Sequence, residues 1–269
     1  MSDDIGDIQA FYNSIVEKED ARLEAHQLEY DLTWRYLEQY LPAKGSILEV
    51  GAATGRYTLE LAKRGYQVTA VDLSPELIGA NRKRLTEAGL EKQVQFVVAD
   101  ARDLGAVTGE FDAVLLMGPL YHLIVEADRH TALREAADRL RTGGILFSAL
   151  LSRMAVFSDL LRNNPGWIET QAEVQSVLAD GKRPDDFPRG GFRAYFVRIP
   201  EIAPLHEAIG FETLTITGVE PAIAAEDANY NKLEGKQRQL WLDLLYAISA
   251  EPSIVGASRH LLYIGKKKA

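Results

Sequence analysis

The sequence predicts an α/β fold with a parallel, doubly wound sheet. Between residues 46 and 151, five short apolar runs alternate with segments in which apolar residues recur at helical spacing. The first run meets the loop Gly51-Ala52-Ala53-Thr54-Gly55, which opens a helix. This order of strand, glycine-bracketed loop and helix is typical of a nucleotide-binding corner. The crossovers between parallel strands are expected to be right-handed.

The expected elements follow in chain order. Helical spacing over residues 8–41 stops at Pro42 and predicts N-terminal helices. Ser74-Pro75-Glu76 combines a cap residue, a first-turn proline and an acid, and so predicts a helix start, whereas Gly65 and Gly89 mark helix ends. The expected strands are residues 46–50, 66–71, 93–99, 111–117 and 145–151, with helices at 57–64, 75–88 and 127–141, a turn at 142–144, and then a helix at 201–209, a strand at 211–218, a helix at 236–249 and a strand at 260–264.

Residues 152–198 break this alternation. Asn163-Asn164-Pro165-Gly166 and a run rich in proline and glycine at 181–191 are interleaved with aromatic residues such as Trp167, Phe192 and Tyr195. A structureless insertion of this length is uncommon unless it has a function. Because it follows the carboxyl end of the fifth strand, where α/β sheets bind ligands, we interpret it as a substrate-recognition lid rather than an inert surface loop.

Composition narrows the functional classes. The 46% hydrophobic and 26% charged residues are typical of a globular protein, and no apolar run approaches the roughly 20 residues of a membrane span. The acidic start lacks the pattern of a signal peptide, so a cytoplasmic location is the default expectation. The absence of cysteine excludes disulfides and thiolate metal sites. A net charge of −9 disfavours a nucleic acid partner and favours a small-molecule substrate.

The first loop argues against a dinucleotide. Gly51 permits a tight turn, and Gly55 is expected to let the helix backbone approach a ligand. The middle glycine of a dinucleotide fingerprint is replaced by Ala53, and Glu49 places a carboxylate where a phosphate would be repelled. A cationic ligand group suits this position better.

With these residues the chain resembles the class I S-adenosylmethionine-dependent methyltransferases, whose first motif is acid-x-Gly-x-Gly/Ala-x-Gly. The motif corresponds to Glu49, Gly51, Ala53 and Gly55. The resemblance implies S-adenosylmethionine as cofactor, S-adenosylhomocysteine as product, and a Rossmann-like seven-stranded sheet in the order 3-2-1-4-5-7-6 that ends in an antiparallel hairpin. The loop then passes beside the methionine part of the cofactor, and Glu49 suits its positive charges.

Two further acids stand at strand ends. Asp72 follows the glycine loop by about the 20 residues that return the chain to the neighbouring strand, and its two oxygens suit the two hydroxyls of a ribose. A helix-capping role is the alternative, but Ser74 is better placed as a cap. For Asp100 the resemblance implies contact with the adenine amine, with the amide of Ala101 reading a ring nitrogen; a plain turn residue is the alternative.

The loop Gly118-Pro119-Leu120-Tyr121-His122-Leu123 follows the fourth strand. It is similar to that of a subgroup of bacterial small-molecule methyltransferases, and its position allows contact with both methyl donor and acceptor. His122 is the candidate base, because an imidazole of near-neutral pKa can take a proton from the acceptor. The alternative is that His122 only positions the loop.

These observations predict an enzyme that transfers a methyl group from S-adenosylmethionine to an oxygen or nitrogen of a small molecule by in-line displacement. A nicotinamide-dependent oxidoreductase and a non-catalytic cofactor-binding protein are the alternatives. No metal-ligand spacing is evident, so no metal is expected, and the chain is expected to be a monomer or homodimer.

The expected parts are an N-terminal helical cap (1–42), a cofactor-binding core (43–151), the lid (152–199) and the C-terminal part of the core sheet (200–269). The candidate catalytic residues are His122 and Tyr121, and the candidate cofactor-binding residues are Tyr12, Glu49, Gly51, Ala52, Ala53, Thr54, Gly55, Tyr57, Asp72, Leu73, Asp100, Ala101 and Met117.

Overall fold

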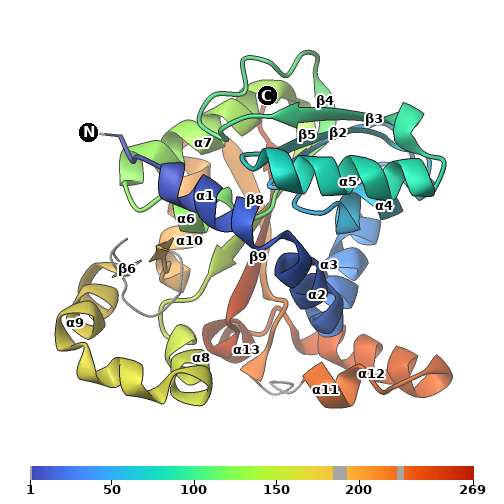
Figure 1. Cartoon of the computed structure of the whole chain (residues 1–269). Coiled ribbons are helices and arrows are strands. Elements are labelled where there is room, and N and C mark those ends of the chain that lie inside the picture. The colour runs from blue at the N-terminus through green and yellow to red at the C-terminus, as the bar shows by residue number, and fades with distance from the viewer. Residues whose placement is uncertain (1, 184–192, 223–226) are drawn as a thin grey trace.

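A seven-stranded mixed sheet runs through the centre of the chain (Figure 1). The computed structural model describes residues 2–183, 193–222 and 227–269. The strand order is β3-β2-β1-β4-β5-β9-β8, with β9 antiparallel to both β5 and β8. This confirms the expected order 3-2-1-4-5-7-6, because β8 and β9 are the sixth and seventh strands of the sheet. The strands are β1 (Ser46–Val50), β2 (Gln67–Asp72), β3 (Val94–Val98), β4 (Phe111–Leu116), β5 (Leu140–Leu151), β8 (Phe211–Gly218) and β9 (His260–Lys267).

Helices cover both faces of this sheet. One core joins the sheet to residues of α7 and α10, and a second joins its other face to residues of α3, α4 and α12. The helices are α1 (Gly6–Ser14), α2 (Val16–Ala25), α3 (Gln27–Tyr40), α4 (Arg56–Lys63), α5 (Pro75–Glu87), α6 (Pro119–His122), α7 (Glu126–Arg139), α10 (Ile199–Glu207), α11 (Asp227–Tyr230), α12 (Gly235–Ile248) and α13 (Pro252–Ala257), with a short 3₁₀ turn at Glu91–Gln93. Among the helices described, the longest have 14 residues, and none has the length and apolar character that a membrane span needs.

Local sequence signals account for the helices around the first strands. The Ser74 hydroxyl accepts a hydrogen bond of 3.1 Å from the Leu77 amide, with Pro75 at the first helical position. Gly65, just after α4, has a φ of +87°. A side chain there would be strained, so glycine ends the helix at the least cost.

The described part of residues 152–199, the expected lid, is more regular than the sequence predicts. It contains α8 (Val156–Asn163), a 3₁₀ turn (Pro165–Glu169), α9 (Gln171–Asp180) and a small hairpin of β6 (Lys182–Arg183) and β7 (Ala194–Tyr195), drawn largely in yellow at the lower left of Figure 1. Trp167 is buried with Phe196 in a small core made mostly of residues from this segment, which also includes Leu151 of β5. The prolines and glycines therefore separate short helices rather than forming one irregular loop. Phe192 and the rest of 184–192 lie outside the described residues.

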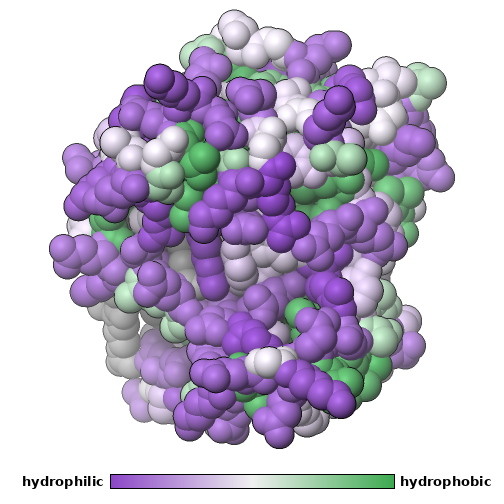
Figure 2. All heavy atoms as spheres, turned by 90° about the vertical axis from the view of Figure 1, so that its right-hand side faces the viewer, coloured by the Kyte–Doolittle hydropathy of each residue, from purple (hydrophilic) through white to green (hydrophobic). Residues whose placement is uncertain are grey.

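Two other expectations were wrong in detail. The turn expected at 142–144 lies within β5, which begins at Leu140 opposite Phe111 and then shifts register, with Gly143 at a φ of +77°. The spacing of Leu240, Leu244, Leu245 and Ile248 predicts that α12 has one apolar face. Leu245 is buried, but Leu240 and Leu244 are 58% and 51% exposed, and Trp241 is also exposed. Figure 2 shows this side of the molecule, mostly hydrophilic with apolar patches near the height of α12. Periodicity alone did not show which side of α12 meets α3.

Candidate functional site

The carboxyl ends of β1 to β4 open into one cavity with an empty volume of about 1220 Å³, open solvent at its mouth included. Helices α1 to α3 contribute to its wall, and so do the loops that follow the four strands. Thr54 and Gly55 are not among the lining residues, although both were expected to bind the cofactor. The other expected residues all line it: Tyr12, Glu49, Gly51, Ala52, Ala53, Tyr57, Asp72, Leu73, Asp100, Ala101, Met117, Tyr121 and His122.

The glycine loop is shaped by contacts within the protein. Gly51 has a φ of +83°, and a Cβ there would lie 2.3 Å from the carbonyl oxygen of Met117, so only glycine fits. Gly55 also has a positive φ, but its close neighbour is the Asn81 side chain rather than the cavity. The Thr54 hydroxyl donates to Asp20 at 2.7 Å. Gly55 therefore lets α4 pack against α5, and Thr54 ties the loop to α2.

Glu49 is the acid at the end of β1, and it is only 1% exposed. One carboxylate oxygen accepts a hydrogen bond of 2.6 Å from the Thr58 hydroxyl. Burial raises the pKa of Glu49 to about 8, against the effect of the Thr58 hydrogen bond and with a contribution from the charge of Asp72. The site thus holds a carboxyl group that ionises readily only when a cation lies beside it.

Asp72 ends β2 with one backbone donor on each oxygen. The amides of Ala53 and Ser74 each donate to it at 2.9 Å. An ionised carboxylate has about four acceptor positions, so both oxygens keep capacity for further donors. Burial raises the pKa of Asp72 to about 6, although these backbone hydrogen bonds act in the opposite direction. Asp72 does not cap α5, because Ser74 does.

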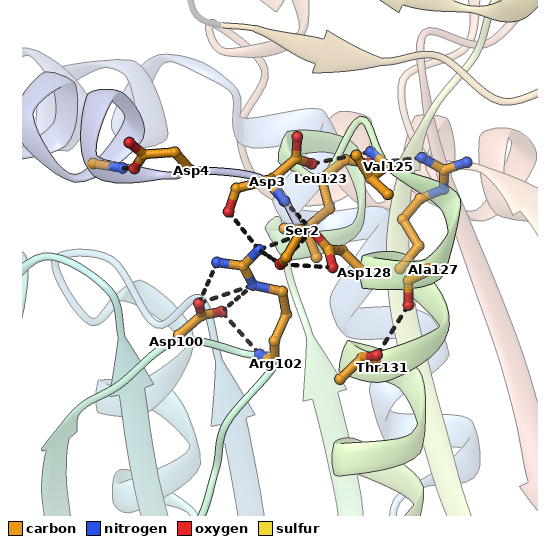
Figure 3. A network of polar contacts seen from close by, with 12 residues as sticks. Ser2, Asp3, Asp4, Asp100, Arg102, Leu123, Val125, Ala127, Asp128 and Thr131 are labelled. Carbon is orange, nitrogen blue, oxygen red and sulfur yellow. Dashed lines mark hydrogen bonds and ion pairs between the residues drawn. The ribbon is translucent and has the colours of Figure 1, made fainter.

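Asp100 has a partner that sequence reasoning missed. The Arg102 guanidinium donates to both of its oxygens, with the shortest contact at 2.6 Å, and also pairs with Asp128 at 2.8 Å (Figure 3). These bonds and the amide of Arg102 use much of the acceptor capacity of Asp100. The hint in the sequence was the two-residue spacing of an acid and an arginine after a strand, but Asp128 and the N-terminal partners could not be inferred from it.

His122 and Tyr12 form a pair across the cavity wall. The Tyr12 hydroxyl lies 2.9 Å from Nε2 of His122. Burial lowers the pKa of His122 to about 3, against a hydrogen bond to the Arg193 backbone, and burial raises the pKa of Tyr12 well above its usual value. With this lowered pKa the ring is neutral near pH 7, whereas a base was expected to have a near-neutral pKa. Tyr121 packs against His122, with ring centroids 4.7 Å apart.

Charged residues that the sequence did not single out line another part of the cavity. Arg22 pairs with Glu19, with the shortest contact at 2.6 Å. His260 lies 2.7 Å from Glu220 and 3.4 Å from Glu29, and these two carboxylates raise its pKa to about 9 although burial alone would lower it. Ligand atoms of Glu29, Glu220 and His260 also come within 4.8 Å of one another, as in a metal site. Arg259, however, already donates to both oxygens of Glu220, so the cluster is balanced by protein cations.

Comparisons with known proteins agree with this geometry. Residues 47–144 match the family model described as a methyltransferase domain. The ubiquinone biosynthesis O-methyltransferase of Xanthomonas axonopodis pv. citri is 39% identical over 113 residues, which is 42% of this chain and 45% of that protein. The chain thus spans less than half the length of this relative.

Solved structures share the fold over most of the chain. A S-adenosylmethionine-dependent methyltransferase from Clostridium acetobutylicum matches with a TM-score of 0.60 and 15% identity, covering 96% of this chain and 99% of that one. The [4+2]-cyclase SpnF matches with a TM-score of 0.56 and 19% identity, covering 91% of this chain and 81% of that one. The fold is therefore shared by proteins with different chemistry. Residues 47–144 are thus similar to a methyltransferase domain, and the sheet order and the solved structures show that the chain has the fold of S-adenosylmethionine-dependent methyltransferases.

Proposed function

We propose that the protein transfers a methyl group from S-adenosylmethionine to an oxygen or nitrogen of a small molecule. The observation that carries the proposal is one cavity in which Glu49, Asp72, Tyr12 and His122 converge from four separate segments. All four side chains have pKa values displaced by burial, which is common where a site binds or transforms a ligand.

The lining suits the parts of S-adenosylmethionine. This cofactor supplies a methyl group on a positively charged sulfur. Glu49 would face its cationic methionine part, and the spare acceptor positions of Asp72 would take the ribose hydroxyls. Leu73 and Ala101 offer apolar contact to the adenine, while Asp100 stays tied to Arg102 and would at most share a remaining acceptor position with the adenine amine.

The acceptor would enter beside Tyr121 and the charged residues of the opposite wall. Tyr57 and Leu262 add apolar surface there, whereas Arg22 and His260 add polar hydrogen atoms. The similarity to an O-methyltransferase of ubiquinone biosynthesis supports an oxygen acceptor, and the apolar lining suits an acceptor with an apolar body. Alignment of acceptor and methyl group would supply most of the acceleration, up to roughly 7–11 kcal/mol in well-oriented systems.

His122 has a positioning part in this proposal. Its neutral ring holds the Tyr12 hydroxyl, and so joins α1 to the loop after β4 over the cavity. A ring with a pKa of about 3 takes up a proton poorly near pH 7, so we do not assign it the role of base. An acceptor that is already nucleophilic, such as an ionised phenol or a neutral amine, needs no base.

The experiment combines binding and turnover. We expect S-adenosylmethionine and S-adenosylhomocysteine, but not NAD(H), to raise the midpoint of thermal unfolding by a few degrees when each is present at about 100 times its dissociation constant. Asp72→Ala should weaken binding of both by about 10-fold or more, whereas Glu76→Ala, an exposed acid on the same turn, should not. Methyl transfer to a panel of phenols and amines then tests catalysis.

Each outcome bears on a different alternative. A shift with NAD(H) alone would replace the methyltransferase by an oxidoreductase. Binding of the adenosyl ligands without transfer to any acceptor in the panel would favour the non-catalytic cofactor-binding protein. Unchanged binding in Asp72→Ala would remove the ribose assignment.

A further inference from the structure

A second cavity lies between the lid and the helices α7 and α10. Its empty volume is about 1270 Å³, open solvent included. Arg129 and His130 of α7 line it, together with Arg153, Lys182 and Tyr195 from the lid region. None of these residues belongs to the cofactor cavity. The two cavities are neighbours, because the carbonyl of Leu123, which lines the first, accepts a hydrogen bond from Arg129 in the second.

Arg129 is a buried cation on the wall of this second cavity. It is 5% exposed, yet among the described residues no carboxylate lies within ion-pair distance of its guanidinium. One nitrogen donates to the Leu123 carbonyl at 2.7 Å, and the group stacks 3.5 Å from the centre of the Tyr195 ring. Burial lowers the pKa of Arg129, and Tyr195 opposes this shift most, followed by Glu126, Asp3 and Glu201, none of which is at ion-pair distance. An arginine has five N–H donors, so most of its hydrogen-bonding capacity remains open.

The other charges around the cavity do not neutralise it. Arg153 is equally buried, but it donates to the carbonyls of Phe196 and Ala179 and to Glu201. Glu201 in turn accepts from the Tyr195 hydroxyl at 2.8 Å. Glu126 and Asp180 are at the rim, with side chains 80% and 53% exposed, next to His130 and Lys182 respectively. Among the residues that the structure describes, the buried floor therefore carries a net positive charge, and the acids around it are either hydrogen-bonded or in solvent.

We propose that this second cavity is a binding site for a small oxyanion, a phosphate or carboxylate group, held by the Arg129 guanidinium and assisted by Lys182. A planar guanidinium binds such groups through two parallel N–H bonds, and it does so most strongly where water is excluded. A buried charge without a partner destabilises the folded protein. An anion that pairs with the Arg129 guanidinium relieves this cost, so its binding is favoured. The site stands apart from methyl transfer and does not depend on the function proposed above.

Inorganic phosphate and acetate are the probes, added separately to the full chain without any adenosyl ligand. We expect each anion to raise the midpoint of thermal unfolding in a saturable way, beyond the effect of sodium chloride at the same ionic strength. Phosphate should be the more effective, because it offers more oxygens and more charge. Arg129→Gln should abolish the saturable part, and Arg129→Lys should retain a weaker response, because lysine keeps the charge but not the planar fork.

Arg134→Gln is the matched control, since Arg134 is an exposed arginine on the same helix. It should respond to phosphate as the natural protein does. If the unfolding midpoint of Arg129→Gln is too low for this comparison, phosphate binding to the folded variants is measured instead by calorimetric titration at 25 °C. A response that matches sodium chloride, or one of equal size in Arg129→Gln, would overturn the proposal.

Discussion

Glu49 is an acid in a buried position, and burial disfavours its ionised form. The carboxyl group is enclosed, accepts one hydrogen bond from Thr58, and lies close enough to Asp72 for that charge to raise its pKa further. In the free protein Glu49 is therefore largely protonated at pH 7. A bound cation would favour the ionised form, so cofactor binding should release a proton.

This gives a prediction about cofactor affinity. Between pH 6.5 and 8, we expect the affinity for S-adenosylmethionine to rise with pH by up to about tenfold per unit, because Glu49 must lose its proton before it can pair with the ligand. Above the pKa of about 8 the rise should level off. Glu49→Gln should bind more weakly at pH 8 and lack this rise. Titration calorimetry in buffers of different ionisation enthalpy measures both affinity and proton release.

The amino group of the ligand titrates in the same pH range. The comparison between variants therefore shows whether the pH dependence of binding comes from Glu49 or from the ligand. Glu76→Gln removes an exposed acid and should keep the pH dependence of the natural protein. An identical pH dependence in Glu49→Gln would show that Glu49 does not face the cationic part of the ligand.

At His122 the structure leads to an expectation about turnover. Because burial lowers its pKa to about 3, we expect kcat at saturating S-adenosylmethionine to show no inflection from this residue between pH 5 and 8. His122→Asn should lower kcat without changing the shape of the profile. A drop in kcat below pH 6.5 that is present in the natural protein and absent from His122→Asn would restore His122 as the base.

Helix α1 is held over the cavity by contacts of residues 2–7 with side chains from distant parts of the chain. Asp128 accepts hydrogen bonds from the Ser2 hydroxyl at 2.9 Å and from the Asp3 amide at 2.6 Å, and Arg102 donates to the Asp3 carbonyl at 2.8 Å (Figure 3). At the far side, Arg193 pairs with Asp3 and Asp7. Since Arg102 also holds Asp100 at the end of β3, one guanidinium joins the N-terminal segment to the cofactor cavity.

Loss of that guanidinium should loosen the helix. In Arg102→Met we expect faster amide hydrogen exchange in residues 5–14, with β1 unchanged, and weaker binding of S-adenosylmethionine because Tyr12 is no longer held in place. Stability should fall by about 1–3 kcal/mol, since the buried carboxylate of Asp128 loses its charged donor. Arg82→Met, which removes an exposed pair with Glu91, is the control and should change neither measurement. Equal exchange rates in the two variants would contradict this role of Arg102.

At the scale of the whole chain, the alternation of strands and helices could be predicted because its signals are local, whereas the strand order was implied by the resemblance to the class I methyltransferases. Buried runs, the glycine loop and the Ser74 cap each act within a few residues, and right-handed crossovers then leave few arrangements. The packed face of α12 and the start of β5 at Leu140 depend instead on distant partners, namely α3 and Phe111. The lid helices were missed for a similar reason, because their apolar residues form a separate small core.

The same distinction holds for the site. Acids at the ends of parallel strands must lie at one edge of the sheet, so Glu49, Asp72 and Asp100 could be placed from the sequence. Contacts between distant segments could not be placed in this way: Arg102, the partner of Asp100, also pairs with Asp128 and donates to the Asp3 carbonyl. Likewise, Glu29 and Glu220 meet His260 only after folding, so no spacing rule identifies the cluster.

That cluster connects α3, the segment after β8 and the start of β9, and it should make stability depend on pH. His260 has a pKa of about 9 in the folded protein, compared with about 6.5 when exposed, so its protonated form is favoured by folding. The stabilisation is fully present below pH 6.5 and is lost as the pH rises through 9. We expect the free energy of unfolding of His260→Gln to be lower than that of the natural protein at pH 6, by no more than about 3 kcal/mol, with the difference vanishing above pH 9.

Urea unfolding at pH 6, 7, 8 and 9 measures this difference in stability, and His130→Gln serves as the control for loss of an imidazole outside the cluster. Glu49 also favours its protonated form on folding, but it is present in both proteins and cancels in the difference. A difference that stays constant from pH 6 to 9 would mean that His260 stabilises the fold by packing alone.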